Sequence, residues 1–299
     1  MELKNDYEVV ETDCQYIDLV FEPGHQLVWA RFKYPGLPCM SKGLLEDVAR
    51  AQEVIERQAR MGRQQGDPSR LMYQVLCSEM PGVFNLGGDL ACFMGLIRTG
   101  DRDALAEYAI SCIDILYRSA VSYDLPFTTI ALVQGEALGG GFEAALSANT
   151  LIAEKGARFG FPETVFGLFP GMGAFSFLAR RLSPALAKRI ITSGKVNTAE
   201  ELYDMGVVDI LVGDGRGIEA VYEYIQHRRG RNAGFHGLEK IVDQCHPLPY
   251  SELRDAVEVW VDTAMKLSDR NLRLVRYLLN AQQRRFGSGG LEISRARAV

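Results

Sequence analysis

The chain has 299 residues, of which 47% are hydrophobic and 24% are charged, and its formal net charge is −5. This composition is typical of a globular protein, and the acidic balance argues against nucleic acid as a partner. No run approaches the roughly 20 apolar residues of a membrane span. The polar, acidic residues 1–13 do not resemble a secretory signal.

The six cysteines and four histidines are scattered, without the spacing of a metal or redox motif. Several cysteines lie in apolar runs, as buried free thiols do. We therefore expect a cytoplasmic protein that uses neither a metal nor another cofactor.

Strands and helices alternate through most of the chain, which predicts an α/β fold. The runs 15–22 and 26–33 flank Pro23-Gly24 and predict a hairpin. Further strands are predicted at 71–78, 128–134 and 207–212, and helices after Ser41, after Asp101 and over 184–193 and 198–205. Beyond these, the apolar spacing is helical over 218–229, 235–243, 251–267 and 269–285. We expect an α/β core with the active site over 1–213 and a helical region over 214–299.

The stretch from Gly135 to Gly173 carries the strongest functional signal. Its three consecutive glycines, 139–141, follow the strand 128–134 and precede the helix-forming sequence FEAALSA. Glycine lets a backbone approach a ligand closely. The unpaired N–H groups at a helix N-terminus suit a negative charge that develops on oxygen. A tight structural turn would use the same residues, so the glycines alone leave both interpretations open.

Two glutamates accompany this glycine loop. Glu143 follows the glycines by two residues, and Glu163 lies in a Phe-Pro-Glu sequence twenty residues later. Two carboxylates beside a small substrate can work as an acid/base pair, and burial can raise their pKa values. Taken singly, Glu143 could cap a helix and Glu163 could be a surface acid. Together they favour a catalytic pair.

A second glycine loop, Asn85 to Leu90, follows the strand predicted at 71–78. Ligands bind in the loops after the carboxyl ends of strands in open α/β sheets. Gly88 could therefore supply an N–H group beside that of Gly140, and two such donors form an oxyanion hole. This hole would suit a thioester enolate or a tetrahedral acyl intermediate. The chain has no GxSxG nucleophile elbow, no GxGxxG after its first strand and no GxxxxGK[ST].

The sequences FNLGGDL, ALGGGFE, FGFPE and GLFPGMG, at their spacing here, resemble the crotonase (enoyl-CoA hydratase/isomerase) superfamily over about residues 16–285. VFNLGGDL, GFEAALS, LFPGMGA and WVDTAM are more similar still to one branch. That branch makes the diffusible signal factors of bacterial quorum sensing, which are cis-2-unsaturated fatty acids. The resemblance implies a spiral of ββα units. It also implies a C-terminal helical region that serves trimerisation and walls the acyl pocket.

The resemblance assigns Glu143 and Glu163 as the catalytic acids and the N–H groups of Gly88 and Gly140 as the oxyanion hole. The implied substrate-binding residues are Leu138, Gly139, Met172 and Trp260. The implied reaction dehydrates a 3-hydroxyacyl group on acyl carrier protein to the cis-2-enoyl thioester and then hydrolyses the thioester. In the dehydration, Glu163 would remove the α-proton while Glu143 protonates the leaving hydroxyl.

Two departures from family patterns matter. After its proline-glycine loop a general hydratase usually has a GG[ST]QRL-like run, whereas residues 173–178 here read GAFSFL. This favours the synthase branch over the alternative, a coenzyme A hydratase or isomerase of fatty acid metabolism. A regulatory binding protein without turnover is a second alternative, which the paired glutamates disfavour. Glu136 stands where the branch is expected to have a neutral residue, and its role is open.

Residues 270–299 carry seven arginines and one acid, a net charge of +6, so the other 269 residues carry −11. This basic stretch is either a solvated helix face or a docking surface for the acidic acyl carrier protein. Arg228, Arg229 and Arg231 form a second candidate patch. The resemblance further implies a homotrimer, and binding to the receiver domain of a cognate sensor kinase.

Overall fold

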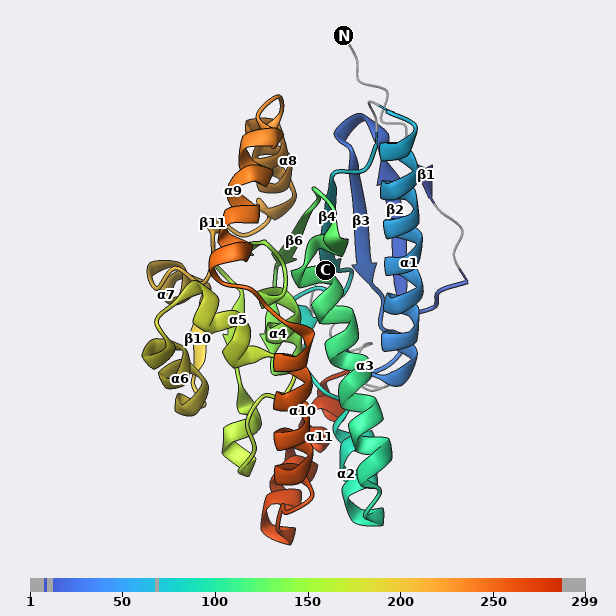
Figure 1. The fold of residues 1–299 in the computed structure, drawn as a ribbon. Coiled ribbons are helices and arrows are strands. Elements are labelled where there is room, and N and C mark those ends of the chain that lie inside the picture. The colour runs from blue at the N-terminus through green and yellow to red at the C-terminus, as the bar shows by residue number, and fades with distance from the viewer. Residues whose placement is uncertain (1–7, 10–12, 68–69, 287–299) are drawn as a thin grey trace, which may run out of the picture.

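The computed structural model of the protein describes residues 8–9, 13–67 and 70–286. It consists of two β-sheets, helices that cover them, and a run of four helices at the end of the described chain (Figure 1). The predicted α/β class is confirmed. Within the described residues, none of the helices combines the length and the hydropathy needed to cross a bilayer.

The larger sheet has seven strands: β1 (Glu8–Val9), β2 (Ile17–Glu22), β3 (Leu27–Phe32), β4 (Tyr73–Ser78), β6 (Thr128–Val133), β8 (Thr150–Glu154) and β11 (Ile210–Val212). Their spatial order is β1-β2-β3-β4-β6-β8-β11. β2 and β3 form the predicted hairpin, whereas β3, β4, β6, β8 and β11 pair in parallel. Every residue of β6 is buried, which explains its apolar sequence.

The smaller sheet has the strand order β10-β9-β7-β5. Its strands are β5 (Val83–Asn85), β7 (Glu136–Leu138), β9 (Arg158–Gly160) and β10 (Val196–Thr198). The chain runs from β4 into β5, from β6 into β7 and from β8 into β9, so three successive passes each add one parallel strand to both sheets. This arrangement is the spiral that the motifs implied, and it brings the two glycine loops to neighbouring strand ends.

The helices are α1 (Lys42–Gln64), α2 (Leu90–Thr99), α3 (Arg102–Ala120), α4 (Gly140–Leu146), α5 (Ala174–Arg181), α6 (Pro184–Ser193), α7 (Ala199–Asp204), α8 (Gly217–Arg228), α9 (Asn232–Cys245), α10 (Tyr250–Ala264) and α11 (Asp269–Phe286). The helices predicted after Ser41 and Asp101 are present as α1 and α3, and the side chains of these two residues cap them by accepting backbone N–H groups. Asp89 caps α2, a helix that the sequence did not predict.

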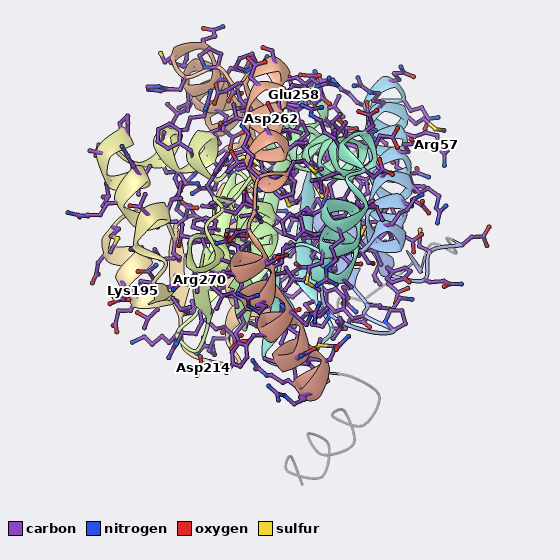
Figure 2. All side chains as sticks on the ribbon, turned by 90° about the horizontal axis from the view of Figure 1, so that it is seen from below. Arg57, Lys195, Asp214, Glu258, Asp262 and Arg270 are labelled. Carbon is purple, nitrogen blue, oxygen red and sulfur yellow. The ribbon has the colours of Figure 1, made fainter. Side chains whose placement is uncertain are left out.

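The last two helices return to the part of the molecule that holds the glycine loops. α10 packs against α3, while α11 packs against α2 and against the short 3-10 helix η3 (Pro162–Phe166) (Figure 1). Arg102 of α3 forms ion pairs with Glu258 (2.7 Å) and Asp262 (2.9 Å). Figure 2 shows these two acids together on α10. The C-terminal helices are thus held beside the loops rather than forming a separate body.

Candidate active site

The three predicted glycines form the turn between β7 and α4. Gly139 has a φ of +50°, and a Cβ atom there would lie 2.3 Å from Oε1 of Glu163. A Cβ atom on Gly141 would lie 2.1 Å from the carbonyl oxygen of Asn85. Side chains at these positions would collide with a candidate catalytic group or with the second glycine loop. The glycines therefore allow a close approach as well as a turn.

The two glycine loops lie against each other. Gly87 has a φ of +95°, and a Cβ atom there would lie 3.1 Å from the backbone nitrogen of Gly140. The N–H of Gly87 donates to Oδ1 of Asn85 (2.8 Å), which closes the second loop on itself. In the described part of the chain, the N–H groups of Gly88 and Gly140 donate to no protein acceptor. Two unpaired N–H groups in adjoining loops are what an oxyanion hole requires, and of the two glycines Gly88 lines the cavity described below, whereas Gly140 is not among its lining residues.

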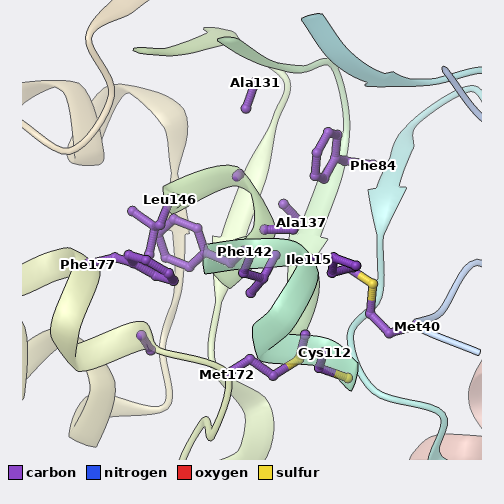
Figure 3. Close-up of a cluster of buried hydrophobic side chains, with 14 of the residues drawn as sticks. Met40, Phe84, Cys112, Ile115, Ala131, Ala137, Phe142, Leu146, Met172 and Phe177 are labelled. Carbon is purple, nitrogen blue, oxygen red and sulfur yellow. The ribbon is translucent and has the colours of Figure 1, made fainter. Parts of the chain in front are cut away.

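Glu143 is buried inside the protein, with 1% of its surface exposed. Its Oε1 accepts hydrogen bonds from the N–H groups of Met172 (2.7 Å) and Ala174 (2.9 Å). Figure 3 shows Phe142, Met172 and Phe177 in the apolar cluster around α4, the helix that carries this glutamate. The carboxyl group is thus fixed at one oxygen and surrounded by hydrocarbon.

Glu163 lies on η3, next to the glycine turn. Its Oε1 lies over Gly139, while its Oε2 is buried and has no hydrogen-bond partner among the described residues. An unpartnered buried carboxylate oxygen is costly unless it binds a proton or a ligand. Oε2 of Glu163 is therefore well suited to take a proton from a substrate.

Burial raises the pKa of both carboxyl groups above their ordinary value of 4.5. The pKa of Glu143 rises to about 8, chiefly through burial and then through the charge of Glu163, although its two N–H donors oppose the shift. Burial raises the pKa of Glu163 to about 7. Near neutral pH such a pair holds about one proton. Glu143 has the higher pKa, so near neutral pH it is the group that keeps a proton and can donate it, whereas Glu163 ionises first and can accept one.

A cavity of about 220 Å³ brings Gly88, Leu138 and Glu163 together. Most of its other lining residues are apolar, as is usual for a ligand site. Five of them come from the C-terminal half of α11: Leu278, Ala281, Gln282, Arg285 and Phe286. Within the described residues, no group of three or more His, Cys, Asp or Glu side chains is placed to hold a metal ion.

A protein-family model described as enoyl-CoA hydratase/isomerase matches residues 65–229, which is more than half of the chain and includes both glycine loops and both glutamates. The protein belongs to the enoyl-CoA hydratase/isomerase family. The superfamily that the sequence motifs resemble is thereby confirmed.

Several solved structures have a similar fold. Human mitochondrial Δ3-Δ2-enoyl-CoA isomerase has a TM-score of 0.71 at 19% identity, over 90% of this chain and 100% of that one. An enoyl-CoA hydratase from Bacillus halodurans has a TM-score of 0.68 at 18% identity, over 91% and 99%. DspI of Pseudomonas aeruginosa has a TM-score of 0.62 at 21% identity, over 85% and 97%. At these identities the likeness establishes the fold.

The resemblance implied four substrate-binding residues in this enoyl-CoA hydratase/isomerase family protein. Three of them lie at the cavity or beside the two glutamates. Leu138 lines the cavity, and Gly139 lies under the carboxylate of Glu163. Met172 is not among the lining residues. Its N–H binds Glu143, and its sulfur lies 2.5 Å from where a Cβ atom on Gly140 would be.

Trp260, the fourth predicted pocket residue, lies behind the cavity wall. Its indole packs against Gly171, where a Cβ atom would lie 2.4 Å from the ring. The ring centroids of Trp260 and Phe93 are 5.6 Å apart, and those of Phe93 and Phe166 are 6.4 Å apart. Phe166 lines the cavity, so Trp260 supports the wall through two other rings.

The structure assigns a partner to Glu136, whose role the sequence left open. Its carboxylate forms an ion pair with Arg285 of α11 at 2.6 Å, and both residues line the cavity. The resemblance implied that the C-terminal helical region walls the pocket, but sequence reasoning identified neither α11 as the helix that lines the cavity nor Arg285 as the partner of Glu136. The apolar spacing of Leu272, Val275 and Leu279 indicates a buried face on this helix, but spacing alone does not identify what that face covers.

The second basic patch proposed from the sequence needs correction. Arg228 is buried, at 4% exposure, and it forms an ion pair with Glu239 at 2.6 Å. Its guanidinium also packs over the rings of Tyr224 and Phe235. It is a structural residue of the α8–α9 pair, and it cannot present its charge to a partner.

Proposed function

We propose that this protein converts a 3-hydroxyacyl thioester of acyl carrier protein into a free cis-2-unsaturated fatty acid, by dehydration followed by hydrolysis. The observation that carries the proposal is the pair of buried carboxyl groups, Glu143 and Glu163, beside the two unpaired N–H groups of the glycine loops. This set provides an acid, a base and an oxyanion site, which both steps require.

Dehydration begins with the thioester oxygen bound to the N–H groups of Gly88 and Gly140. The carboxylate of Glu163 takes the proton from C2, and the electron pair forms an enolate whose charge the two N–H groups stabilise. The enolate collapses to the C2–C3 double bond as the C3–O bond breaks. Glu143 gives its proton to the departing hydroxyl, which leaves as water.

This step leaves Glu163 protonated and Glu143 ionised, which is the arrangement that hydrolysis needs. The Glu143 carboxylate takes a proton from water as the water oxygen attacks the thioester carbonyl. The same oxyanion hole binds the tetrahedral intermediate. The C–S bond then breaks, and Glu163 protonates the leaving thiolate. Both glutamates return to their starting states, so one proton-sharing pair suffices for the complete cycle.

The charge on α11 supports a carrier protein as the donor of the acyl group. Arg270, Arg273, Arg276 and Arg284 are exposed on this helix, which also walls the cavity, and Figure 2 shows Arg270 at its surface. Acyl carrier protein is acidic, so this face complements it. Arg295 and Arg297 of the predicted basic stretch lie outside the described residues. A homotrimer and a complex with the receiver domain of a sensor kinase are also proposed, from the resemblance alone.

A second candidate function is hydration or isomerisation of a coenzyme A thioester, which the family match favours. It would use the same oxyanion hole and the same glutamates, but it would leave the thioester intact. Mass spectrometry of purified protein with a 3-hydroxyacyl carrier protein separates the two functions. We expect free cis-2-enoic acid and unloaded carrier protein. A trans-2-enoyl thioester that stays bound to its carrier would overturn the proposal in favour of the second candidate.

A further inference from the structure

We infer that Tyr108 is a positioning residue of the oxyanion hole, which orients the N–H of Gly88 without touching the substrate. Tyr108 lies on α3 and is not among the residues that line the cavity. Its hydroxyl lies 3.5 Å from the position that a Cβ atom on Gly88 would take. The inference rests on the proposed function, because it assumes that Gly88 binds the thioester oxygen.

The hydroxyl group of Tyr108 connects two backbone segments. It accepts a hydrogen bond from the N–H of Asp89 (2.9 Å) and donates one to the carbonyl oxygen of Met40 (2.8 Å). The directions are fixed, because an amide N–H can only donate and a carbonyl oxygen can only accept. One hydroxyl therefore holds the peptide that follows Gly88 and anchors it to the segment before α1.

Met40 holds the peptide between Gly87 and Gly88. Its N–H donates to the carbonyl oxygen of Gly87 at 2.7 Å. This carbonyl belongs to the same planar peptide unit as the N–H of Gly88, and in a trans peptide the two groups point in opposite directions. With the carbonyl bound to Met40, the N–H of Gly88 must point away from Met40.

Gly87 and Gly88 offer little resistance of their own to rotation of these peptides, because glycine populates a wide range of φ and ψ. The restraint comes from Met40 on one peptide and from Tyr108 on the next. Burial raises the pKa of Tyr108 well above its ordinary value, so the phenol stays protonated and remains a donor throughout the working pH range. A change of pH near neutrality therefore does not remove either of its two hydrogen bonds.

The test is Tyr108→Phe, which keeps the ring and removes only the hydroxyl. Misplacing an oxyanion donor by about 1 Å can cost up to about 100-fold in rate. We therefore expect kcat with the carrier-protein substrate to fall about 10- to 100-fold while KM changes less than about threefold. Tyr123→Phe is the control. Tyr123 is also buried, and its hydroxyl binds the side chain of Gln74, away from the cavity.

A spectroscopic readout distinguishes positioning from a loss of stability. An amide analogue of the substrate, in which nitrogen replaces the thioester sulfur, resists hydrolysis and can carry ¹³C at its carbonyl. In infrared spectra, the bound carbonyl should absorb at a higher frequency in Tyr108→Phe than in the wild type, because its hydrogen bond is weaker. The Tyr123→Phe control should match the wild type.

The failure of the inference differs from the failure of the proposed function. If the wild-type protein turns over the thioester and Tyr108→Phe retains both the wild-type kcat and the wild-type carbonyl frequency, Tyr108 is only structural and the inference is overturned. A lower kcat with an unchanged carbonyl frequency also overturns it. If the wild type itself turns over no thioester, the proposed function fails. The inference about Tyr108 is then judged by the infrared spectra alone, and an unchanged carbonyl frequency in Tyr108→Phe would reject it.

Discussion

Arg285 on α11 forms an ion pair with Glu136 on β7, with 2.6 Å between Nη1 of the arginine and Oε2 of the glutamate. The two residues are 149 positions apart in the sequence and both line the cavity. Phe286, the next residue of α11, is buried in a small cluster with Val83 and Leu86. The C-terminal end of α11 is therefore fixed to the same strand that leads into the glycine turn.

This ion pair should contribute little to stability by itself. The Arg285 side chain is 55% exposed and that of Glu136 is 29% exposed, so solvent screens their attraction. In a double-mutant cycle of Glu136→Gln and Arg285→Gln, measured by urea denaturation, we expect a coupling energy of about 0.2–1 kcal/mol. Arg284→Gln, in place of Arg285→Gln, is the control and should show no coupling. Equal coupling for both arginines would mean that the pair is not specific.

The two glutamates should fail at different points of the dehydration. Glutamine at position 143 keeps the oxygen that accepts the N–H groups of Met172 and Ala174, but it cannot donate a proton to the hydroxyl. Glu143→Gln should therefore still exchange the C2 proton with deuterium oxide, and it should form product at least about 100-fold more slowly. Glu163→Gln should lose both exchange and product. NMR of the substrate measures the exchange. If Glu163→Gln still exchanged the proton, the assignment of the base would be wrong.

The pH dependence of kcat/KM should be bell-shaped. Activity needs Glu163 ionised, so it should rise as pH passes through about 7, and it needs Glu143 protonated, so it should fall above about 8. Because the two groups interact, the measured values belong to the pair. A profile that stays flat from pH 5 to 9 would contradict this assignment.

Charge reversal on α11 should weaken binding of the carrier protein without affecting the chemistry. Arg273→Glu combined with Arg276→Glu should raise KM for an acyl carrier protein substrate about 10-fold or more at low salt, because the docking face loses its charge. KM for a short pantetheine thioester should not change. The matched control reverses Arg57 and Arg63 on α1, and Figure 2 shows Arg57 well apart from Arg270. An equal effect of both pairs would indicate a response to net charge only.

The residues of the candidate site could be picked out from the sequence because they lie in short, recognisable segments. The glycines at 139–141 make close contacts that a side chain would prevent, as the run of three glycines suggested. Both predicted glutamates lie beside this turn. The hairpin and the helices after Ser41 and Asp101 were predicted for the same reason: local residues determine them. The strands β8 and β9 were missed. They are short, and their conformation depends on pairing with β6 and β7.

The contacts that close the site could not be predicted, because they join distant segments. Nothing near Glu136 indicates Arg285 as its partner. Arg228 stands beside two other arginines and looked like part of a basic surface, yet Glu239 and the Phe235 ring enclose it. Trp260 matched a pocket position, but Phe93 and Phe166 lie between it and the cavity. In each case, the packing of one element against another that is distant in the sequence decides the role of the side chain.

The most direct test of the account is hydrolysis of a preformed cis-2-enoyl carrier-protein thioester by the wild type, by Glu143→Gln and by Glu163→Gln. In the proposed mechanism, Glu143 and Glu163 swap protonation states between dehydration and hydrolysis. Both steps must therefore depend on both glutamates. We expect the wild type to release free cis-2-enoic acid and both variants to release it at least about 100-fold more slowly. Hydrolysis at the wild-type rate by either variant would show that other residues cleave the thioester, and it would contradict the shared-pair mechanism.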